Sequence, residues 1–184
     1  MPVRTKSRVL VLNCGSSSGK SSIARALQEL LPGVWLTFGV DTFIESLPGR
    51  GDSPRSGIGF DERGAVILSD GYSRLENVWY SGLSAMVEAG ADIILEEVLV
   101  SGGAGQERLR SAFAGRSQIW VGVRCDADVA AARDAARGDR AAGMARLQAS
   151  IVHEGVSYDV EVDTTRSTPD ECARVIGDFL RATA

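Results

Sequence analysis

Short apolar segments alternate along the chain with longer segments in which apolar and polar positions recur in a helical pattern. The apolar segments are expected to be strands and cover residues 8–12, 34–38, 92–96, 119–123 and 160–162. Between them, apolar side chains recur every three or four residues, which places them on one face of a helix. Strands that alternate with helices predict a parallel sheet covered on both faces. We therefore expect an α/β fold, a three-layer sandwich around a five-stranded parallel sheet.

The helices between these strands follow from the apolar spacing and from residues that typically start or stop a helix. Helices are expected at 20–31, 41–47 and 106–113, and one long helix is expected to end near residue 90. Residues 126 to about 148 are expected to form helices with breaks near Gly138 and Gly143, and a last helix follows Thr168-Pro169. Residues 48–64 are rich in Gly, Ser, Arg and Pro, which predicts a long loop. A short extra strand is expected at 65–68, and a turn at 102–105.

Length and composition limit the function classes. The 184 residues suffice for one domain with a substantial core, so we expect a single domain over 1–184. No apolar run approaches the roughly 20 residues of a membrane span, and no signal peptide is evident. We therefore expect a cytoplasmic protein without a membrane partner. The net charge of −4 argues against a nucleic-acid partner.

The cysteines and the histidine give little support to metal or redox chemistry. Cys14, Cys125 and Cys172 are far apart in the sequence, and their odd number is typical of a reducing compartment. With His153 as the single histidine, a zinc site is not expected. For His153 we expect a structural hydrogen bond.

The segment from Cys14 to Ser21, between the first strand and the first helix, carries the most specific motif. It reads Cys-Gly-Ser-Ser-Ser-Gly-Lys-Ser and differs from the phosphate-loop pattern G-x-x-x-x-G-K-[ST] only in Cys14. A side chain at position 14 is tolerated if its φ angle is negative. The alternative is a chance Gly/Ser turn, which the flanking strand and amphipathic helix make improbable.

A phosphate loop of this kind binds nucleotide phosphates through backbone N–H groups and the helix N-terminus. In such a loop Lys20 reaches the β- and γ-phosphates of ATP, and Ser21 binds Mg²⁺. The residues expected to bind the nucleotide are Gly15, Ser16, Ser17, Ser18, Gly19, Lys20, Ser21 and Ser22.

Carboxylates follow the ends of two other predicted strands. Asp41 follows the second strand, and Glu96 and Glu97 end the third. Because ligands of an open parallel sheet bind beyond the carboxyl ends of its strands, these acids are candidates to bind Mg²⁺ or to orient an attacking hydroxyl. For the metal we select Glu96 together with Ser21. The alternative for Asp41, equally supported, is that it caps the following helix.

Three arginines, Arg133, Arg137 and Arg140, are spaced by four and three residues. On a continuous helix they would share one face. Guanidinium groups near glycines suit a lid over transferred phosphate, which we place at about 133–148. A solvated face with local ion pairs is the alternative.

Nearly the full chain, from Leu10 to Asp163, resembles the chloramphenicol 3′-O-phosphotransferase family. The resemblance is carried by residues 12–21, 35–41 with 44–45, 102–110, 120–126, 136–140 with 142–144, and 152–156 with 158–165. It implies a P-loop kinase fold and transfer of the γ-phosphoryl group of ATP to the primary hydroxyl of the drug. The resemblance implies that Asp41 is the catalytic base and that Arg137 and Arg140 are the lid arginines. Lys20 of the phosphate loop completes the expected catalytic residues.

Two departures from the family affect the interpretation. The family has glycine where this chain has Cys14, and a pair of aspartates at Glu96-Glu97. Residues 48–64 also match poorly, so the acceptor is less well defined than the kinase chemistry. An acceptor wall could come from apolar residues near the second strand and the long helix, although core packing is an equal alternative and the better one for Trp79. These residues are Phe38, Phe43, Ile44 and Trp79.

Two alternatives stay open beside the drug kinase, which acts on a small-molecule alcohol. One is a kinase of the same fold that phosphorylates another hydroxylated metabolite. The other is a nucleotide-binding regulator without acceptor chemistry, against which Asp41, Arg137 and Arg140 argue. The sequence leaves the oligomeric state undetermined.

Overall fold

The computed structural model describes residues 8–51, 53–62, 66–137 and 144–183 of the chain. Its main sheet has the spatial order β2 (Trp35–Gly39), β5 (Asp92–Glu97), β1 (Arg8–Asn13), β6 (Ser117–Arg124) and β7 (Val160–Asp163). All four neighbouring pairs run parallel. The expected five-stranded parallel sheet is therefore confirmed.

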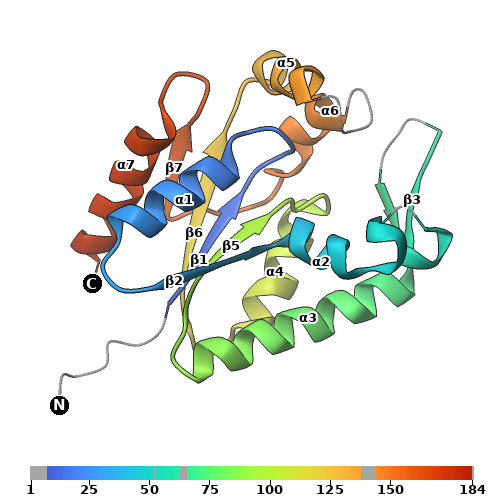
Figure 1. The fold of residues 1–184 in the computed structure, drawn as a ribbon, viewed down its shortest axis with the longest axis horizontal. Helices are drawn as coiled ribbons and strands as arrows, with labels where there is room; N and C mark the ends of the chain where they lie inside the picture. The colour runs from blue at the N-terminus through green and yellow to red at the C-terminus, as the bar shows by residue number, and fades with distance from the viewer. Residues whose placement is uncertain (1–7, 52, 63–65, 138–143, 184) are drawn as a thin grey trace.

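Helices cover both faces of this sheet (Figure 1). One face packs against α1 (Lys20–Leu30) and α7 (Pro169–Ala182), and the other against α3 (Asp70–Glu88) and α4 (Gly102–Ala112). The alternation of side chains along a strand creates these two cores. In β1, for example, Leu10 and Leu12 belong to the first core, whereas Val9 and Val11 belong to the second. The three-layer sandwich is confirmed.

Three further helices lie near the carboxyl ends of the strands. They are α2 (Val40–Ser46), α5 (Ala127–Arg137) and α6 (Met144–Ile151). The loop between β1 and α1 lies between α2 on one side and the α5–α6 pair on the other (Figure 1). Segments distant in the sequence thus meet around this loop. No helix of the described residues is long and apolar enough to cross a membrane.

The segment expected to be a loop at 48–64 contains regular structure. Two short 3₁₀ turns, η1 (Pro48–Gly51) and η2 (Pro54–Ser56), precede β3 (Ile58–Phe60). β3 pairs antiparallel with β4 (Val66–Leu68), which corresponds to the extra strand expected at 65–68. A strand of three residues with a central glycine has too few positions to show a period of two, so the pattern missed β3.

The turn expected at 102–105 is wrong, because these glycines form the first turn of α4. The N–H of Gly103 donates a hydrogen bond of 2.8 Å to the carbonyl oxygen of Glu154. A Cβ at Gly102 would lie only 2.3 Å from that same oxygen. The glycines therefore let the start of α4 press against a distant backbone segment, a contact that local sequence cannot reveal.

Candidate active site

The loop from Cys14 to Ser21 has the conformation of an anion cradle at a helix N-terminus. Gly19 immediately precedes α1 with a φ of +90°, a left-handed conformation that favours glycine. The Lys20 ammonium donates hydrogen bonds of 2.9 Å to the carbonyl oxygens of Cys14 and Gly15. The lysine thus lies over the loop, with its charge close to the backbone that would surround a phosphate.

Cys14 fits this loop because its backbone does not need the positive φ angle that favours glycine. Among the described residues, the non-glycine positions with positive φ are Ser17 and Arg50, so Cys14 has the negative φ that the sequence required. Its side chain is buried in the core formed with α1 and α7. Burial raises the pKa of the Cys14 thiol, and the nearby Lys20 charge only partly opposes this. The thiol is therefore protonated and acts as a small core residue.

Ser21 and Glu96 come together at the start of α1. The Ser21 hydroxyl donates a hydrogen bond of 2.7 Å to Oε2 of Glu96. A hydroxyl and a carboxylate are oxygen ligands of the kind that Mg²⁺ prefers. The described residues include no group of three or more His, Cys, Asp or Glu side chains suited to a metal. The pair therefore fits an ion whose other ligands would come from phosphate and water.

Glu97 points away from that pair, because successive strand residues face opposite sides of the sheet. It is 2% exposed and accepts a hydrogen bond of 3.2 Å from the Tyr80 hydroxyl on α3. Burial, reinforced by the negative charge of Glu76, raises the pKa of the Glu97 carboxyl to about 8. Of the two acids that end β5, only Glu96 is placed to share a metal with Ser21.

Asp41 lies in the first turn of α2, directly after β2. The N-cap of α2 is Gly39, which makes no side-chain capping hydrogen bond, so Asp41 is not the N-cap residue. A Cβ at Gly39 would lie 2.5 Å from the carbonyl oxygen of Glu96, so this glycine lets β2 end close against β5. The exposed Asp41 carboxylate is thereby brought to the same edge as Glu96.

These groups line one cavity of about 300 Å³. Its lining residues are Ser16, Ser17, Ser18, Gly19, Lys20, Ser21, Ser22, Arg25, Gln28, Thr37, Gly39, Val40, Asp41, Thr42, Glu45, Glu96 and Val98. Most of these side chains are polar. The described structure thus joins the phosphate loop, the Ser21–Glu96 pair and Asp41 in one space.

The expected apolar acceptor wall is not part of this lining. Phe43 packs with Tyr72 in a buried cluster, and Trp79 packs against both that cluster and the α3–α4 core. Phe38 stacks edge-on with Trp79, with ring centroids 6.0 Å apart. Trp79 therefore packs in the core, as favoured from the sequence, and so do its aromatic neighbours Phe38 and Phe43. Ile44 is also absent from the cavity lining.

The arginine row is only partly described. Arg133 donates a hydrogen bond of 2.9 Å to the carbonyl oxygen of Thr164, so it ties α5 to the segment after β7. Arg137 is the last residue of α5. Arg140 lies outside the described residues, as does the centre of the expected lid at 138–143. The roles of Arg137 and Arg140 stay predictions.

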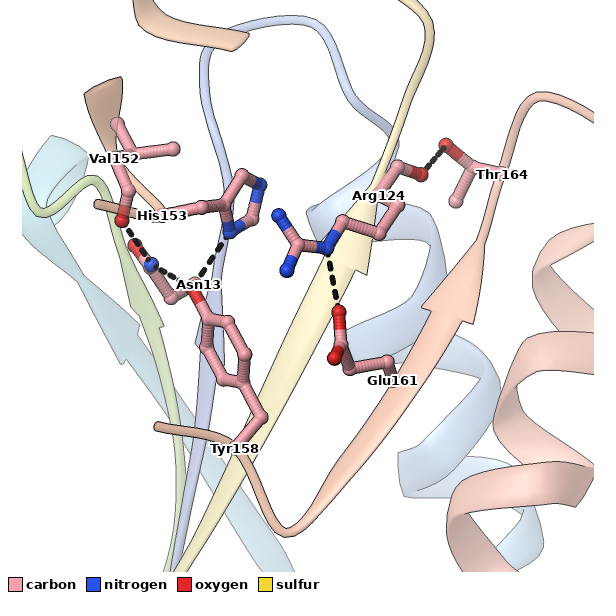
Figure 2. Close-up of polar contacts among 7 residues, drawn as sticks. All are labelled: Asn13, Arg124, Val152, His153, Tyr158, Glu161 and Thr164. Atoms are coloured by element: carbon pink, nitrogen blue, oxygen red, sulfur yellow. Dashed lines mark hydrogen bonds and ion pairs between the residues drawn. The ribbon is translucent and has the colours of Figure 1, made fainter. Parts of the chain in front are cut away.

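A polar network behind the phosphate loop was not anticipated in full (Figure 2). Asn13, the last residue of β1, donates hydrogen bonds to the carbonyl oxygen of Val152 at 2.7 Å and to the Tyr158 hydroxyl at 2.6 Å. The Tyr158 hydroxyl also lies 2.6 Å from Nδ1 of His153, which has the expected hydrogen-bonding role. Burial and the Arg124 charge lower the pKa of His153 to about 4. These hydrogen bonds hold the segment after α6 against β1, the strand that precedes the phosphate loop.

Two loop contacts were missed by sequence reasoning. The Ser17 hydroxyl donates a hydrogen bond of 2.7 Å to Asp134 of α5, and the Ser16 N–H donates one of 2.9 Å to the side-chain oxygen of Gln148 of α6. Helical spacing placed Asp134 among the arginines but carried no signal for a partner more than a hundred residues earlier.

Comparison with known proteins identifies a family and a set of similar structures. The family described as chloramphenicol phosphotransferase-like protein matches residues 7–181. The chain is 29% identical over 188 residues to the Mycobacterium tuberculosis (strain H37Rv) protein named "Putative O-phosphotransferase Rv2636". That alignment covers 95% of this chain and 83% of the relative.

Solved structures of kinases share the fold. An unliganded sugar kinase from Janibacter sp. HTCC2649 has a TM-score of 0.64 at 19% identity, covering 96% of this chain and 95% of its own. The APS kinase CysC of Mycobacterium tuberculosis, in complex with AMPPNP and APS, has a TM-score of 0.63 at 17% identity, with 96% and 98% covered. At these identities the likeness establishes the fold alone, and it confirms the expected P-loop kinase sandwich.

Proposed function

The chain belongs to the chloramphenicol phosphotransferase-like protein family, and from this premise we propose that it transfers the γ-phosphoryl group of ATP to a hydroxyl of a small molecule. The observation that carries the proposal is that Lys20, Ser21, Glu96 and Asp41 line the same cavity. A phosphate donor and an alcohol acceptor must meet in one space, and this cavity has groups suited to both.

The donor half consists of the phosphate loop and its lysine. The backbone N–H groups at the start of α1 would bind the phosphates, and Lys20 would offer its ammonium to the β- and γ-phosphates. Mg²⁺ fits the Ser21–Glu96 pair, because the two oxygen ligands are 2.7 Å apart at the mouth of the loop. When bound, that ion neutralises negative charge on the phosphates.

The acceptor half depends on Asp41. Its carboxylate would orient the attacking hydroxyl and accept its proton, late in the reaction because the transition state of phosphoryl transfer is loose. Arg137 and Arg140, assigned by the family resemblance, would compensate charge on the migrating group. A pure nucleotide-binding regulator needs no carboxylate in the position of Asp41, so the cavity favours an enzyme.

The resemblance puts forward the primary 3′-hydroxyl of chloramphenicol, or of a similar compound, as the acceptor. Such a reaction would inactivate an antibiotic. The polar lining favours a second candidate, another hydroxylated metabolite with more hydrogen-bonding groups. The buried hydroxyl of Thr37 has no partner among the described residues, and Arg25 and Gln28 line the same space. An acceptor rich in hydroxyl groups would offer a hydrogen-bond partner to Thr37.

The direct test is incubation of the full chain with ATP, Mg²⁺ and chloramphenicol, read by mass for a phosphorylated product. A polyol panel under the same conditions tests the second candidate. We expect a phosphorylated alcohol from one of these sets, and its loss in Lys20→Ala. ATP binding without product from any alcohol would favour the regulator instead. Normal ATP use by Lys20→Ala would refute the assignment of the loop.

A further inference from the structure

Two buried polar side chains from α5 and α6 hydrogen-bond the phosphate loop from the side opposite α2. Asp134 accepts from the Ser17 hydroxyl at 2.7 Å, and Gln148 accepts from the Ser16 N–H at 2.9 Å. Asp134 is 8% exposed and Gln148 is 6% exposed. Buried polar groups with such short contacts hold their partners in place, because losing either partner leaves the other unsatisfied.

The Ser17 contact acts on a strained point of the loop. Ser17 has a φ of +56°, a left-handed conformation that is unfavourable for a residue with a Cβ. A hydrogen bond to a carboxylate is stronger than one between neutral groups. The Asp134 bond can therefore offset the backbone strain at Ser17 and keep the loop in this conformation.

The Gln148 contact depends on close packing of α6 against the loop. A Cβ at Gly15 would lie 3.0 Å from Cβ of Gln148 and 3.2 Å from its backbone carbon. The end of α6 is also tied to β1, because Asn13 donates to the carbonyl oxygen of Val152 (Figure 2). Two contacts therefore fix the position of Gln148: the close approach of Gly15, and the hydrogen bond from Asn13 to Val152 just after α6.

We propose that Asp134 and Gln148 are positioning residues, which hold the Ser16–Ser17 segment in the shape that lets the loop bind the phosphates of ATP. The inference rests on the proposed function, since it concerns ATP at the same loop. It assigns these two residues no contact with ATP. They act through the loop conformation, and their loss should weaken nucleotide binding more than it weakens the fold.

The chain offers a matched control on the same two helices. Asp128 of α5 forms an ion pair with Arg146 of α6, and both side chains are exposed. This pair also joins α5 to α6 but is not part of the loop or the cavity lining. Asp128→Ala therefore removes an acidic group and an α5–α6 contact without touching Ser16 or Ser17.

The test is a double-mutant cycle on Ser17 and Asp134 in the full chain. The dissociation constant of Mg·ATP is measured by calorimetry for the wild type, Ser17→Ala, Asp134→Ala and the double variant, with thermal melts of each. We expect each single change to weaken ATP binding about tenfold, and the double change to weaken it no further. Asp134→Asn should recover most of the affinity, because its amide oxygen still accepts from the Ser17 hydroxyl. Asp128→Ala should stay within about twofold of the wild type.

Gln148→Met, of similar size but without the acceptor, should also weaken ATP binding while leaving the melting temperature close to that of Asp128→Ala. The inference would be overturned if the double variant lost ATP affinity by the product of the two single losses. It would also be overturned if Asp128→Ala lost as much ATP affinity as Asp134→Ala. If a variant fails to fold, Ser17→Ala and Asp134→Asn still decide it. Wild type that does not bind ATP would instead refute the proposed function, so the two failures are distinguishable.

Discussion

At the scale of single residues, two consecutive acids at the end of β5 have different environments. Glu96 accepts a hydrogen bond from Ser21, whereas Glu97 is buried under Tyr80 on the opposite face. The alternation of a strand makes this separation predictable. Which acid faces the loop still depends on the register of β5 with β1, which places Glu96 opposite Leu12 and Glu97 opposite Asn13. The sequence gives no direct access to that register.

The role of Asp41 leads to a prediction about turnover. If Asp41 orients the acceptor hydroxyl and accepts its proton, Asp41→Asn should lower kcat by about 100-fold or more and leave the affinity for ATP unchanged. Steady-state kinetics and calorimetry on the same preparation measure both quantities. Asp170→Asn, an acid in the first turn of α7, serves as the control. Near-normal turnover of Asp41→Asn would show that Asp41 is not the base.

Glu97 leads to a prediction about stability and pH. Its pKa is about 8 in the folded chain and near 4.5 when unfolded, so between these pH values the folded state holds a proton that the unfolded state releases. The contribution of Glu97 to stability is therefore fully present below about pH 4.5 and is lost as pH rises towards 8. We expect Glu97→Gln, which cannot ionise, to be more stable than the wild type at pH 8.5 by on the order of a few kcal/mol.

Urea unfolding at pH 5 and pH 8.5 measures this difference, with the exposed Glu107→Gln as control. The gain from Glu97→Gln should shrink at pH 5, where the folded wild type already carries the proton. An equal gain at both pH values would contradict the raised pKa of Glu97.

At the scale of elements, the pattern predicted the strands and most helices within a few residues. The strands succeed because an apolar run between turn signals is typical of a buried parallel strand. The failures have a common cause. β3 exists because Ile58 and Phe60 pair with Leu68 and Val66, and α4 starts early because Gly103 bonds Glu154. Both elements depend on residues elsewhere in the chain, which the local sequence pattern does not identify.

The start of α7 provides a prediction at this scale. Thr168 and Glu171 form a reciprocal capping box, in which each side chain accepts a hydrogen bond from the other's backbone N–H. Thr168→Ala should lower the free energy of unfolding by about 1 kcal/mol. α7 packs on α1, and none of its residues lines the cavity, so ATP affinity should not change. Urea unfolding with calorimetry checks this, and a large loss of affinity would show coupling between α7 and the loop.

At the scale of the whole molecule, the parallel topology assembles the candidate site. The phosphate loop follows β1, Asp41 follows β2, and Glu96 belongs to the end of β5, so one edge of the sheet collects all three. This assembly was predictable, because ligands bind beyond the carboxyl ends of parallel strands. The contacts of Asp134 and Gln148 were not, since they join residues 117 and 132 positions apart.

The proposed reaction of this cavity is the transfer of phosphate from ATP to an alcohol. The most direct measurement follows label from γ-³²P-ATP into chloramphenicol and the polyol panel, with Mg²⁺, for the wild type and Asp41→Asn. We expect a labelled phosphate ester with one ADP formed per ester, and its near-complete loss in Asp41→Asn. Label released only as inorganic phosphate, or an ester formed equally by both proteins, would contradict it.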